Sequence, residues 1–174
     1  MDVAFRILGQ EDANDYRQLR LISYQEAAEA FSESYEDEKE KELQAFEAEL
    51  IIKGEPAEWF VLGAFVDEKL IGFVKFRRDQ RSKARHKSMV HAMYVDPAYR
   101  GHGIGRRIIE DLLQRVRQQE GLEQIHLWVL HANGKSAAPF YASLGFVRQG
   151  PLVKKDLKIG QLYIDAEYMV MYLD

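Results

Sequence analysis

The sequence predicts an α+β fold in which helices pack against a β-sheet built from segments along the whole chain. Two patterns support this prediction. Short apolar runs bounded by Gly, Pro or Asp are typical of strands, and longer segments have apolar residues at helical spacing. The length of 174 residues suits one domain. We therefore expect residues 1–174 to form a single domain, without repeats, linkers or low-complexity segments.

The first half of the chain contains two helical patterns and a hairpin. Tyr16, Leu19 and Ser23 lie along one side of the first helical pattern, and Leu43 and Phe46 share one side of the second. The expected elements are a strand over residues 5–8, a helix from Glu11 to about Phe31, a helix from about Glu38 to Lys53, and strands over Trp59–Val66 and Lys69–Arg77.

The second half alternates strands with helices. Ile104, Ile108, Leu112 and Val116 form an apolar stripe, which predicts a long amphipathic helix that Gly121 ends. The expected elements are a strand over Met89–Val95, a helix over about Gly103–Glu120, a strand over Ile125–Leu130, a helix over about Gly134–Leu144, a strand beginning at Phe146, and a closing strand or strands over Leu162–Ile164 and Tyr168–Leu173.

Composition limits the classes of function. The chain has no cysteine, which excludes disulfides, thiolate metal sites and an acyl-cysteine intermediate. A formal net charge of −4 argues against binding nucleic acid through bulk electrostatics. No apolar run approaches the roughly 20 residues that cross a bilayer, and the charged opening segment argues against a signal or transit peptide. We expect a cytoplasmic protein with no metal, and with neither nucleic acid nor membrane as a partner.

Three glycines alternate at the point where a strand leads into the long helix. The segment from His91 to Arg107 contains Arg100-Gly101-His102-Gly103-Ile104-Gly105 at its centre. Glycine permits positive φ and close approach of a ligand to the backbone. Successive N–H groups and the positive end of the following helix then suit a pyrophosphate, and Arg100, Arg106 and Arg107 add positive charge.

Other phosphate-binding motifs fit this segment poorly. A Walker A loop needs Lys and Ser or Thr after its last glycine, but Arg106 and Arg107 follow Gly105. A dinucleotide-binding loop needs the spacing G-x-G-x-x-G, whereas the spacing here is G-x-G-x-G. A glycine-rich entry to a helix, without any ligand, is the remaining alternative.

At these residues the chain resembles a known family. Arg100–Gly105 resembles the R/Q-x-x-G-x-G/A signature of the GNAT N-acetyltransferase superfamily, and Met93–Pro97 resembles the end of the strand before it. Leu127–Asn133 and Ser136–Phe146 are similar to the family's second conserved region, in which an aromatic–Tyr pair precedes Leu-Gly-Phe. With weaker similarity at both ends, the resemblance covers essentially the whole chain.

The resemblance implies a three-layer α/β arrangement: a mixed, mostly antiparallel sheet with helices on both faces. It implies acetyl-CoA as co-substrate, a small-molecule or peptide amine as acceptor, and a homodimer as an arrangement that the family adopts. The residues that it assigns to coenzyme binding are Met93, Tyr94, Val95, Arg100, Gly101, His102, Gly103, Ile104, Gly105, Arg106, Asn133, Ser136 and Tyr141.

The family's chemistry is attack of a neutral amine on a thioester. By resemblance, the Met93 N–H polarises the thioester carbonyl, and the Val95 backbone pairs with the pantetheine arm. Tyr141 matches the general acid that protonates the departing thiolate. The alternative role for Tyr141 is packing between Phe140 and Phe146.

The second conserved region departs from the family pattern by one residue. Tyr141 lies eight residues after Asn133, and the family's usual spacing is one residue shorter. Pro139 falls within the expected helix, where a proline lacks an N–H and kinks the chain. We interpret this as a one-residue insertion near Gly134 that Pro139 helps to accommodate. The insertion weakens the role assigned to Asn133 more than the role assigned to Tyr141.

The general base is harder to assign. Many relatives use an acidic residue on the strand before the glycine loop, but no carboxylate lies there. Strand alternation predicts two sets of side chains on opposite faces: Met89, His91 and Met93 against Val90, Ala92 and Tyr94. His91 titrates near neutral pH and is our candidate base or water-positioning residue. Further candidates are Glu58, His131 and Asp96, of which Asp96 also suits a turn cap.

Two charged segments and the acceptor site leave alternatives open. The acidic run over residues 33–42 is expected as a solvated helix start and loop, or as a rim that attracts a cationic substrate. The basic segment Arg77–Lys87 is expected as a solvated loop, or as a site for the coenzyme's 3′-phosphate or an anionic substrate. The aromatic residues that could line the acceptor pocket or belong to the core are Tyr24, Phe31, Trp59 and Tyr163.

Three alternatives to acetyl transfer remain at this stage. The glycine motif binds the coenzyme rather than the acyl chain, so the chain could transfer another acyl group, such as succinyl. A noncatalytic CoA-binding domain would keep the loop and dispense with the acid, which Tyr141 argues against. A nucleotide-binding module would leave the region from Asn133 to Phe146 unexplained.

Overall fold

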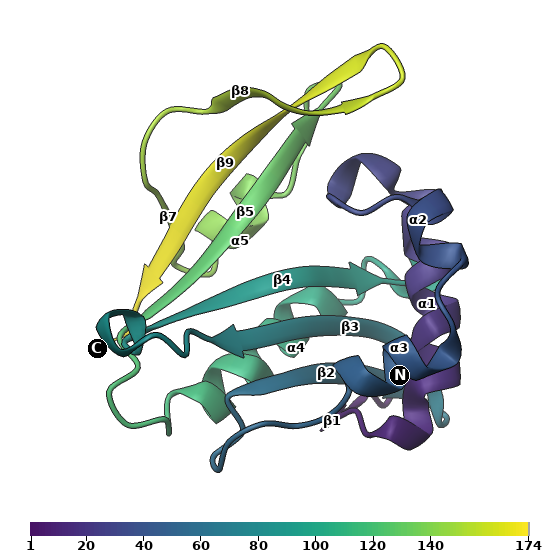
Figure 1. Cartoon of the computed structure of the whole chain (residues 1–174), viewed down its shortest axis with the longest axis vertical. Helices are drawn as coiled ribbons and strands as arrows, with labels where there is room; N and C mark the ends of the chain where they lie inside the picture. Colours follow the sequence, from purple (N-terminus) through teal and green to yellow (C-terminus); the bar gives the residue numbers. More distant parts are fainter. Residues whose placement is uncertain (174) are drawn as a thin grey trace.

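A computed structural model describes residues 1–173, in which one sheet is flanked by helices (Figure 1). The strands are β1 (Ala4–Ile7), β2 (Trp59–Val66), β3 (Lys69–Arg78), β4 (Lys87–Val95), β5 (Gln124–Ala132), β6 (Lys135–Ser136), β7 (Val147–Arg148), β8 (Val153–Ile159) and β9 (Leu162–Tyr172). The α-helices are α1 (Ala13–Glu26), α2 (Tyr35–Lys39), α3 (Leu43–Glu49), α4 (Ile104–Val116) and α5 (Ala138–Ala142). Short 3-10 helices are η1 (Gln10–Asp12), η2 (Ala28–Ala30), η3 (Ser82–Ala84) and η4 (Pro97–Tyr99). None of the helices within residues 1–173 is long and apolar enough to cross a membrane.

The sheet is divided between β4 and β5. Its strand order is β1-β2-β3-β4-β5-β9-β7, with β6 beside β5 and β8 beside β9, and every pair is antiparallel except β4 with β5. That parallel pair joins only Lys87–Met89 to Gln124–His126, after which the strands diverge (Figure 1). From Val90 to Val95, β4 is therefore paired only with β3, and alternate peptide groups on its other edge have no strand partner.

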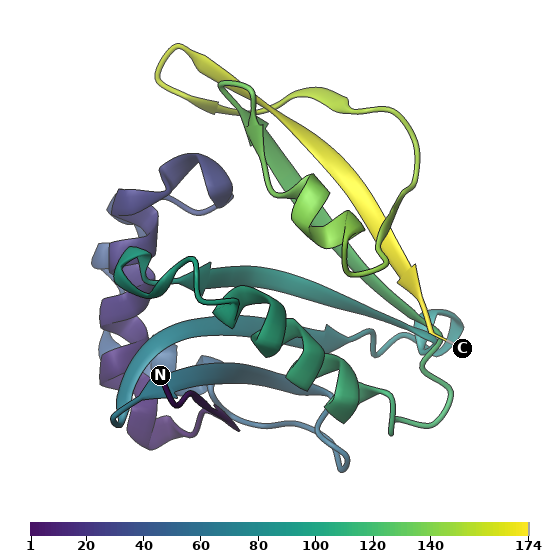
Figure 2. The same cartoon turned by 180° about the vertical axis from the view of Figure 1, so that it is seen from behind.

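Helices cover both faces of the sheet, which confirms the predicted fold class. The stripe of α4 packs on one face, and its residues Ile104, Ile108, Leu112 and Val116 are each at most 2% exposed. α5 lies on this same side, in front of β5 and β9 when the molecule is seen from behind (Figure 2). On the opposite face, Tyr16 of α1 and Phe46 of α3 pack against Phe73 of β3 in a second core.

A bulge in β4 breaks the predicted alternation of its side chains. Between Val90 and Met93, β4 has one residue more than the segment of β3 that pairs with it. Val90 and Met93 therefore both contact the core beneath α4, whereas Ala92 and Tyr94 contact the core beneath α1. The predicted grouping of Val90 with Ala92 and Tyr94 is wrong, because strict alternation assumes an unbroken ladder.

The helical region after β1 is more divided than predicted. α1 ends at Glu26, and the helix expected over residues 38–53 is instead the two short helices α2 and α3. The chain bends between them, so that Glu38 and Glu49 both reach Arg20 of α1, at N–O distances of 3.1 and 2.6 Å. Apolar periodicity cannot reveal such an ionic contact, which explains the error.

The helix predicted over about residues 134–144 is a hairpin followed by a shorter helix. Asn133 and Gly134 have φ values of 51° and 71° and form the two-residue turn between β5 and β6. α5 begins only at Ala138, so Pro139 lies in its first turn, where proline fits without a kink. The hairpin accommodates the additional residue of this region. The kink predicted at Pro139 is wrong.

The C-terminal strands are also more extensive than predicted. β8 occupies a segment for which the sequence predicts no strand, and the closing region is a single strand, β9, over Leu162–Tyr172. β8 pairs only with β9, and its side chains are almost all exposed. A strand without a buried face lacks the alternation of apolar residues from which strands are predicted.

Candidate active site

The glycine loop turns from β4 into α4 with backbone angles that glycine adopts readily. Gly101 and Gly103 have φ values of 79° and 72°. A Cβ atom added to either glycine would have no neighbour within 4 Å, so both face open space. α4 begins at Ile104, and the first N–H groups of a helix have no partner within the helix. The loop and the start of α4 form a cradle that fits a pyrophosphate.

A cleft of about 680 Å³ opens between this loop, the end of β4 and α5. We call it the coenzyme cleft, after the residues predicted for coenzyme binding that line it. The residues predicted for coenzyme binding that line it are Met93, Tyr94, Val95, Arg100, Gly101, Gly103, Ile104, Gly105, Arg106 and Tyr141. Sequence reasoning did not assign the other side of the cleft, where Ala27, Ala30 and Phe31 follow α1. These residues carry no motif, and only their position in the fold brings them to the cleft.

The arginines of the loop have different surroundings. Arg100 donates hydrogen bonds to both carboxylate oxygens of Glu26, at 3.0 and 2.7 Å, and to the carbonyl oxygen of Val95 at 2.8 Å. The Arg100 guanidinium accordingly holds the pKa of Glu26 below its usual range. Arg106 lines the cleft, whereas Arg107 stacks on an aromatic ring of β1. Arg100 thus ties the glycine loop to the end of α1, and Glu26 compensates its charge.

Tyr141, the predicted general acid, reaches the unpaired edge of β4. Its hydroxyl oxygen lies 3.6 Å from the Met93 sulfur. Gly105 makes room for that methionine, since a Cβ at Gly105 would lie 3.2 Å from the Met93 methyl group. Burial raises the pKa of Tyr141 to about 12, so the phenol is protonated at neutral pH. β4, α4 and α5 together hold a protonated phenol in the wall of the cleft.

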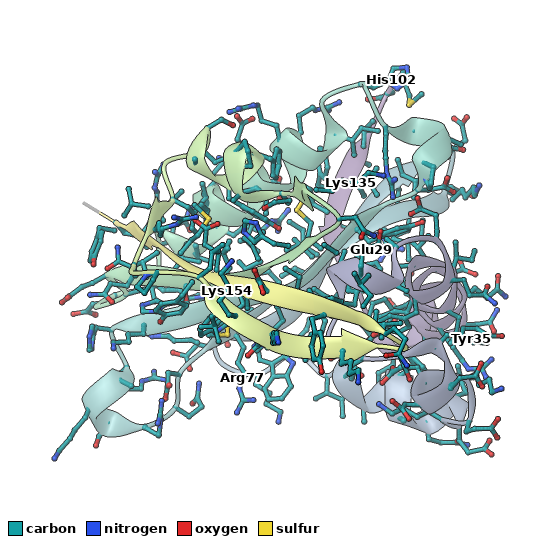
Figure 3. All side chains as sticks on the ribbon, turned by 90° about the horizontal axis from the view of Figure 1, so that it is seen from above. Glu29, Tyr35, Arg77, His102, Lys135 and Lys154 are labelled. Atoms are coloured by element: carbon teal, nitrogen blue, oxygen red, sulfur yellow. The ribbon has the colours of Figure 1, made fainter. Side chains whose placement is uncertain are left out.

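A second cavity, of about 320 Å³, is lined by η2, β3, β4, β5 and β8, with no residue from α4 or α5. We call it the acceptor cavity, because the candidate base for the acceptor amine, His91, lines it. Ala30 and Phe31 line both the acceptor cavity and the coenzyme cleft, so the two spaces meet beside β4. In Figure 3, His102 of the glycine loop and Arg77 of β3 lie on opposite sides of the molecule.

His91, the candidate base, lines the acceptor cavity. Its pKa lies below the ordinary histidine value because burial disfavours the imidazolium and because Lys75 and Arg77 repel its charge, while Glu33 acts in the opposite direction. The imidazole is therefore neutral at pH 7 and able to accept a proton. Glu33 and Asp156 also line this cavity, and sequence reasoning proposed neither as a base. Asp156 was not considered because the sequence predicts no strand where β8 lies.

The other candidate bases lie outside both spaces. Glu58 is paired with Arg85, at an N–O distance of 2.5 Å. Asp96 caps η4 by accepting a backbone hydrogen bond at 2.9 Å, in keeping with the turn-cap role. His131 Nε2 lies 2.6 Å from a carboxylate oxygen of Glu167. Nowhere in residues 1–173 do three or more His, Asp or Glu side chains converge as metal ligands would.

Three residues predicted to contact the coenzyme do not line the cleft. The His102 ring folds back on its own loop, with Nδ1 2.9 Å from a carbonyl oxygen. Asn133 is exposed at the tip of the β5–β6 turn. Ser136 accepts a hydrogen bond from the first N–H of α5 at 3.0 Å. Ser136 therefore orients the helix that carries Tyr141.

Among the aromatic residues considered for the acceptor site, only Phe31 lines the acceptor cavity. Tyr24 is buried in the core beneath α1, Trp59 lies under an arginine side chain, and Tyr163 lies between two lysines of β8. Trp128 of β5 supplies the other aromatic wall and is 47% exposed. Trp128 could have been found from the sequence, because it is a large apolar residue on the side of the strand that also carries polar residues.

Lys75 connects the acceptor cavity to a buried ionic cluster. Its Nζ lies 3.0 Å from a carboxylate oxygen of Glu49, which also accepts a hydrogen bond from Arg20. The side chains of Arg20 and Glu38 are each 2% exposed. Burial opposes the ionisation of Glu49, but Lys75 and Arg20 outweigh it and lower the pKa of Glu49. This cluster holds α1, α2 and α3 behind the acceptor cavity.

The sheet divides beside β4, a glycine loop and a helix follow this strand, and a cavity opens on each side of it. The acetyltransferase (GNAT) family model matches residues 22–146. The chain therefore belongs to the GNAT acetyltransferase family, which confirms the resemblance stated from its motifs.

Similar proteins extend over different shares of the chain. An uncharacterised N-acetyltransferase of Methanocaldococcus jannaschii is 29% identical over 143 residues, which cover 81% of this chain and 59% of that protein. This chain spans between 23% and 59% of the length of the first curated relatives that it matches.

Solved structures share the fold over nearly the whole chain. An acetyltransferase of the GNAT family from Streptococcus pneumoniae has a TM-score of 0.80 at 20% identity, covering 99% of this chain and 100% of that one. An acetyltransferase from Salmonella typhimurium, solved with its cofactor acetyl-CoA, has a TM-score of 0.75 at 20% identity and covers 100% and 95%.

Proposed function

We propose that this protein is an N-acetyltransferase that transfers an acetyl group from acetyl-CoA to a primary amine of a small molecule or peptide. One observation supports this above the others. The coenzyme cleft and the acceptor cavity share Ala30 and Phe31, so a donor and an acceptor bound in them would meet at β4. The family membership and the acetyl-CoA bound by a protein of the same fold support the choice of donor.

The coenzyme cleft suits the parts of this co-substrate. The open faces of Gly101 and Gly103 and the start of α4 offer N–H groups to a pyrophosphate. Arg106 adds positive charge in the same cleft. Between Met93 and Val95, peptide groups that β5 does not pair are available to the amides of a pantetheine arm.

The residues at β4 support direct attack of the amine on the thioester. The nitrogen lone pair bonds to the carbonyl carbon, the carbon–sulfur bond breaks, and the nitrogen loses a proton to solvent, which gives an amide and a thiolate. The Met93 N–H is our candidate donor to the carbonyl oxygen as negative charge builds there. The Tyr141 hydroxyl gives its proton to the thiolate and recovers one from solvent. Its pKa of about 12 keeps it protonated until that step.

His91 supplies the complementary proton transfer. An ammonium group must lose a proton before its nitrogen can attack, and a neutral imidazole accepts that proton directly or through a water molecule. The lowered pKa of His91 favours the neutral form at pH 7. Glu33 and Asp156 in the same cavity add negative charge that attracts the ammonium form of the acceptor.

The test is a spectrophotometric thiol-release assay with acetyl-CoA and a panel of polyamines, aminoglycosides, amino acids and peptides with free N-termini. We expect at least one amine to release thiol above the amine-free rate and to appear as its N-acetyl derivative by mass spectrometry. Coenzyme binding by calorimetry without thiol release from any acyl donor or acceptor would contradict the proposal and indicate a noncatalytic CoA-binding protein. Release only from another acyl-CoA, such as succinyl-CoA, would correct the acyl group.

A further inference from the structure

The acceptor cavity continues into a neighbouring hollow along β4. Met89 and His91 line both the acceptor cavity and this hollow, which has a volume of about 440 Å³. On the other wall, Trp128 of the acceptor cavity stacks on Tyr168 of the hollow, with ring centroids 4.8 Å apart. The two spaces form one groove, with Met89 and His91 on one wall and Trp128 and Tyr168 on the other. We call it the acceptor groove.

One end of the acceptor groove is acidic. Glu33, which follows η2, and Asp156 of β8 line the acceptor cavity from different segments. The cation in this cavity is Lys75, which is paired with Glu49 at 3.0 Å. In the part of the chain that the structure describes, neither Glu33 nor Asp156 forms an ion pair, so both carboxylates are available to the ammonium form of an amine.

The other end of the groove is basic. Arg77 and Lys87 line the hollow, and within residues 1–173 neither forms an ion pair. Arg81 in the same hollow is different, because Asp79 neutralises it at 2.5 Å. The Arg77 guanidinium carbon lies 4.5 Å from the centroid of the Trp59 ring, which restricts the movement of this side chain. Two cations without partners at one end of a groove suit an anion.

The positive charges of Arg77 and Lys87 affect two histidines of the groove, His91 and His126. The pKa of His91 is lowered by burial and then by Arg77 among other cations, and the pKa of His126 is lowered by burial and then by Lys87. An anionic group bound between Arg77 and Lys87 would lower the electrostatic energy of this end of the groove.

We propose that the acceptor is an elongated amine that carries an anionic group, a carboxylate or a phosphate, several bonds from the reacting nitrogen. This inference rests on the proposed acetyltransferase function. The amine lies beside His91 at the acidic end, and the anion binds Arg77 and Lys87 at the basic end. The stacked rings of Trp128 and Tyr168 contact the segment between the amine and the anion. Each of the two spaces is large enough for a small-molecule ligand, so a short alkyl amine leaves most of the groove unfilled.

The test compares acceptors in matched pairs that differ in charge. One series pairs ω-amino acids of increasing length with their primary amides. The other uses C-terminally amidated tetrapeptides with Asp, phosphoserine, Asn or Lys as the second or third residue, which separates carboxylate from phosphate. At the best length or position, we expect kcat/KM about five- to tenfold higher for the anionic member, mainly through KM. The advantage should shrink in about 0.5 M NaCl, because salt screens exposed charges.

Variants of the basic end locate the effect. Arg77→Gln and Lys87→Gln, singly and combined, remove the partners of the anion. Lys83→Gln is the matched control, because it makes the same charge change at an exposed position of the same loop, outside both spaces. The double variant should bring the acid-to-amide ratio close to one, whereas the control keeps the wild-type ratio.

Two kinds of failure are distinguishable. A wild-type ratio near one, a ratio unchanged in the double variant, or acetylation confined to amines without an anion would overturn this inference and leave the acetyltransferase function in place. Absence of thiol release with every amine would instead remove the proposed function, and this inference with it.

Discussion

The coenzyme cleft and the acceptor groove adjoin the same strand, but they are built in different ways. The cleft is formed mostly by one continuous segment, Met93 to Arg106, whose backbone angles and N–H groups provide its chemistry. The groove is formed by side chains from β3, β4, β5, β8, β9 and the segment after η2. A site made from backbone tolerates changes in its neighbours, whereas a site made from scattered side chains is specific to the chain that carries them.

The two sides also differ in what supports them. α4, behind the glycine loop, is held by the apolar core that its buried stripe forms with the sheet. α1, α2 and α3, behind the acceptor cavity, are held in addition by the cluster of Arg20, Glu38, Glu49 and Lys75. Ionic support of this kind depends on pH and on each partner being present.

The largest expected effect comes from breaking that cluster. Arg20→Met leaves the carboxylates of Glu38 and Glu49 without their buried guanidinium partner. We expect a loss of about 3 kcal/mol in the free energy of unfolding, because a buried charge is left without compensation. Urea denaturation at pH 7 measures it. Arg17→Met on the same helix is the control, since Arg17 donates only to one carbonyl oxygen, at 3.2 Å. Equal losses in the two variants would contradict the role of the cluster.

The same cluster gives a direction for acid sensitivity. Lys75 and Arg20 lower the pKa of Glu49 in the folded protein, so its ionised form stabilises the fold above the unfolded pKa of about 4.3. That stabilisation is lost as the pH falls through the lower folded value. We expect the wild type to lose more stability between about pH 5 and pH 3 than Arg20→Met does.

The second effect concerns catalysis at the junction of the two spaces. Tyr141→Phe removes the proton donor and keeps the ring, so we expect turnover at least about tenfold lower with little change in coenzyme affinity. Steady-state thiol release and calorimetry measure the two quantities. Tyr99→Phe is the matched control, because Tyr99 also lines the coenzyme cleft. Wild-type turnover in Tyr141→Phe would exclude Tyr141 as the general acid.

The difference between the two sides also explains how much could be predicted from the sequence. The glycine loop and α4 were predictable because contiguous residues specify both: glycines for positive φ, and a stripe from Ile104 to Val116 for the helix. The β5–β6 hairpin could have been predicted as well, since Asn133-Gly134 is a strong turn signal. Gly134 was instead assigned to the start of a helix.

The acceptor groove was not predictable in the same way. Its walls depend on the bulge after Val90, which leaves no pattern in the sequence and determines which side chains face the groove. Trp128 and Asp156 come together only through the pairing of β5 and β8 with β9. The bend that brings Glu38 and Glu49 to Arg20 is likewise a tertiary ionic contact, which no local pattern records.

A third, smaller effect tests the base on the acceptor side. If His91 is the base, its lowered pKa places the acidic limb of the wild-type kcat/KM profile below the ordinary histidine value of about 6.5. His91→Ala should remove this limb and reduce kcat/KM at pH 7 by about tenfold or less, since water partly replaces the base. A variant that keeps the wild-type limb would exclude His91 and direct attention to Glu33 and Asp156, which line the same cavity.

The smallest effect concerns the contact between the two sides, where Arg100 of the glycine loop is paired with Glu26 of α1. Both side chains are partly exposed, at 46% and 36%, so Glu26→Gln should change the free energy of unfolding by about 0.5 kcal/mol or less. The same substitution removes a negative charge beside the cleft proposed for the coenzyme phosphates. We therefore expect acetyl-CoA to bind about twofold more tightly at low salt and equally at high salt, measured by calorimetry. Weaker binding at low salt would show that the pair acts by ordering the loop, and that this ordering outweighs the charge.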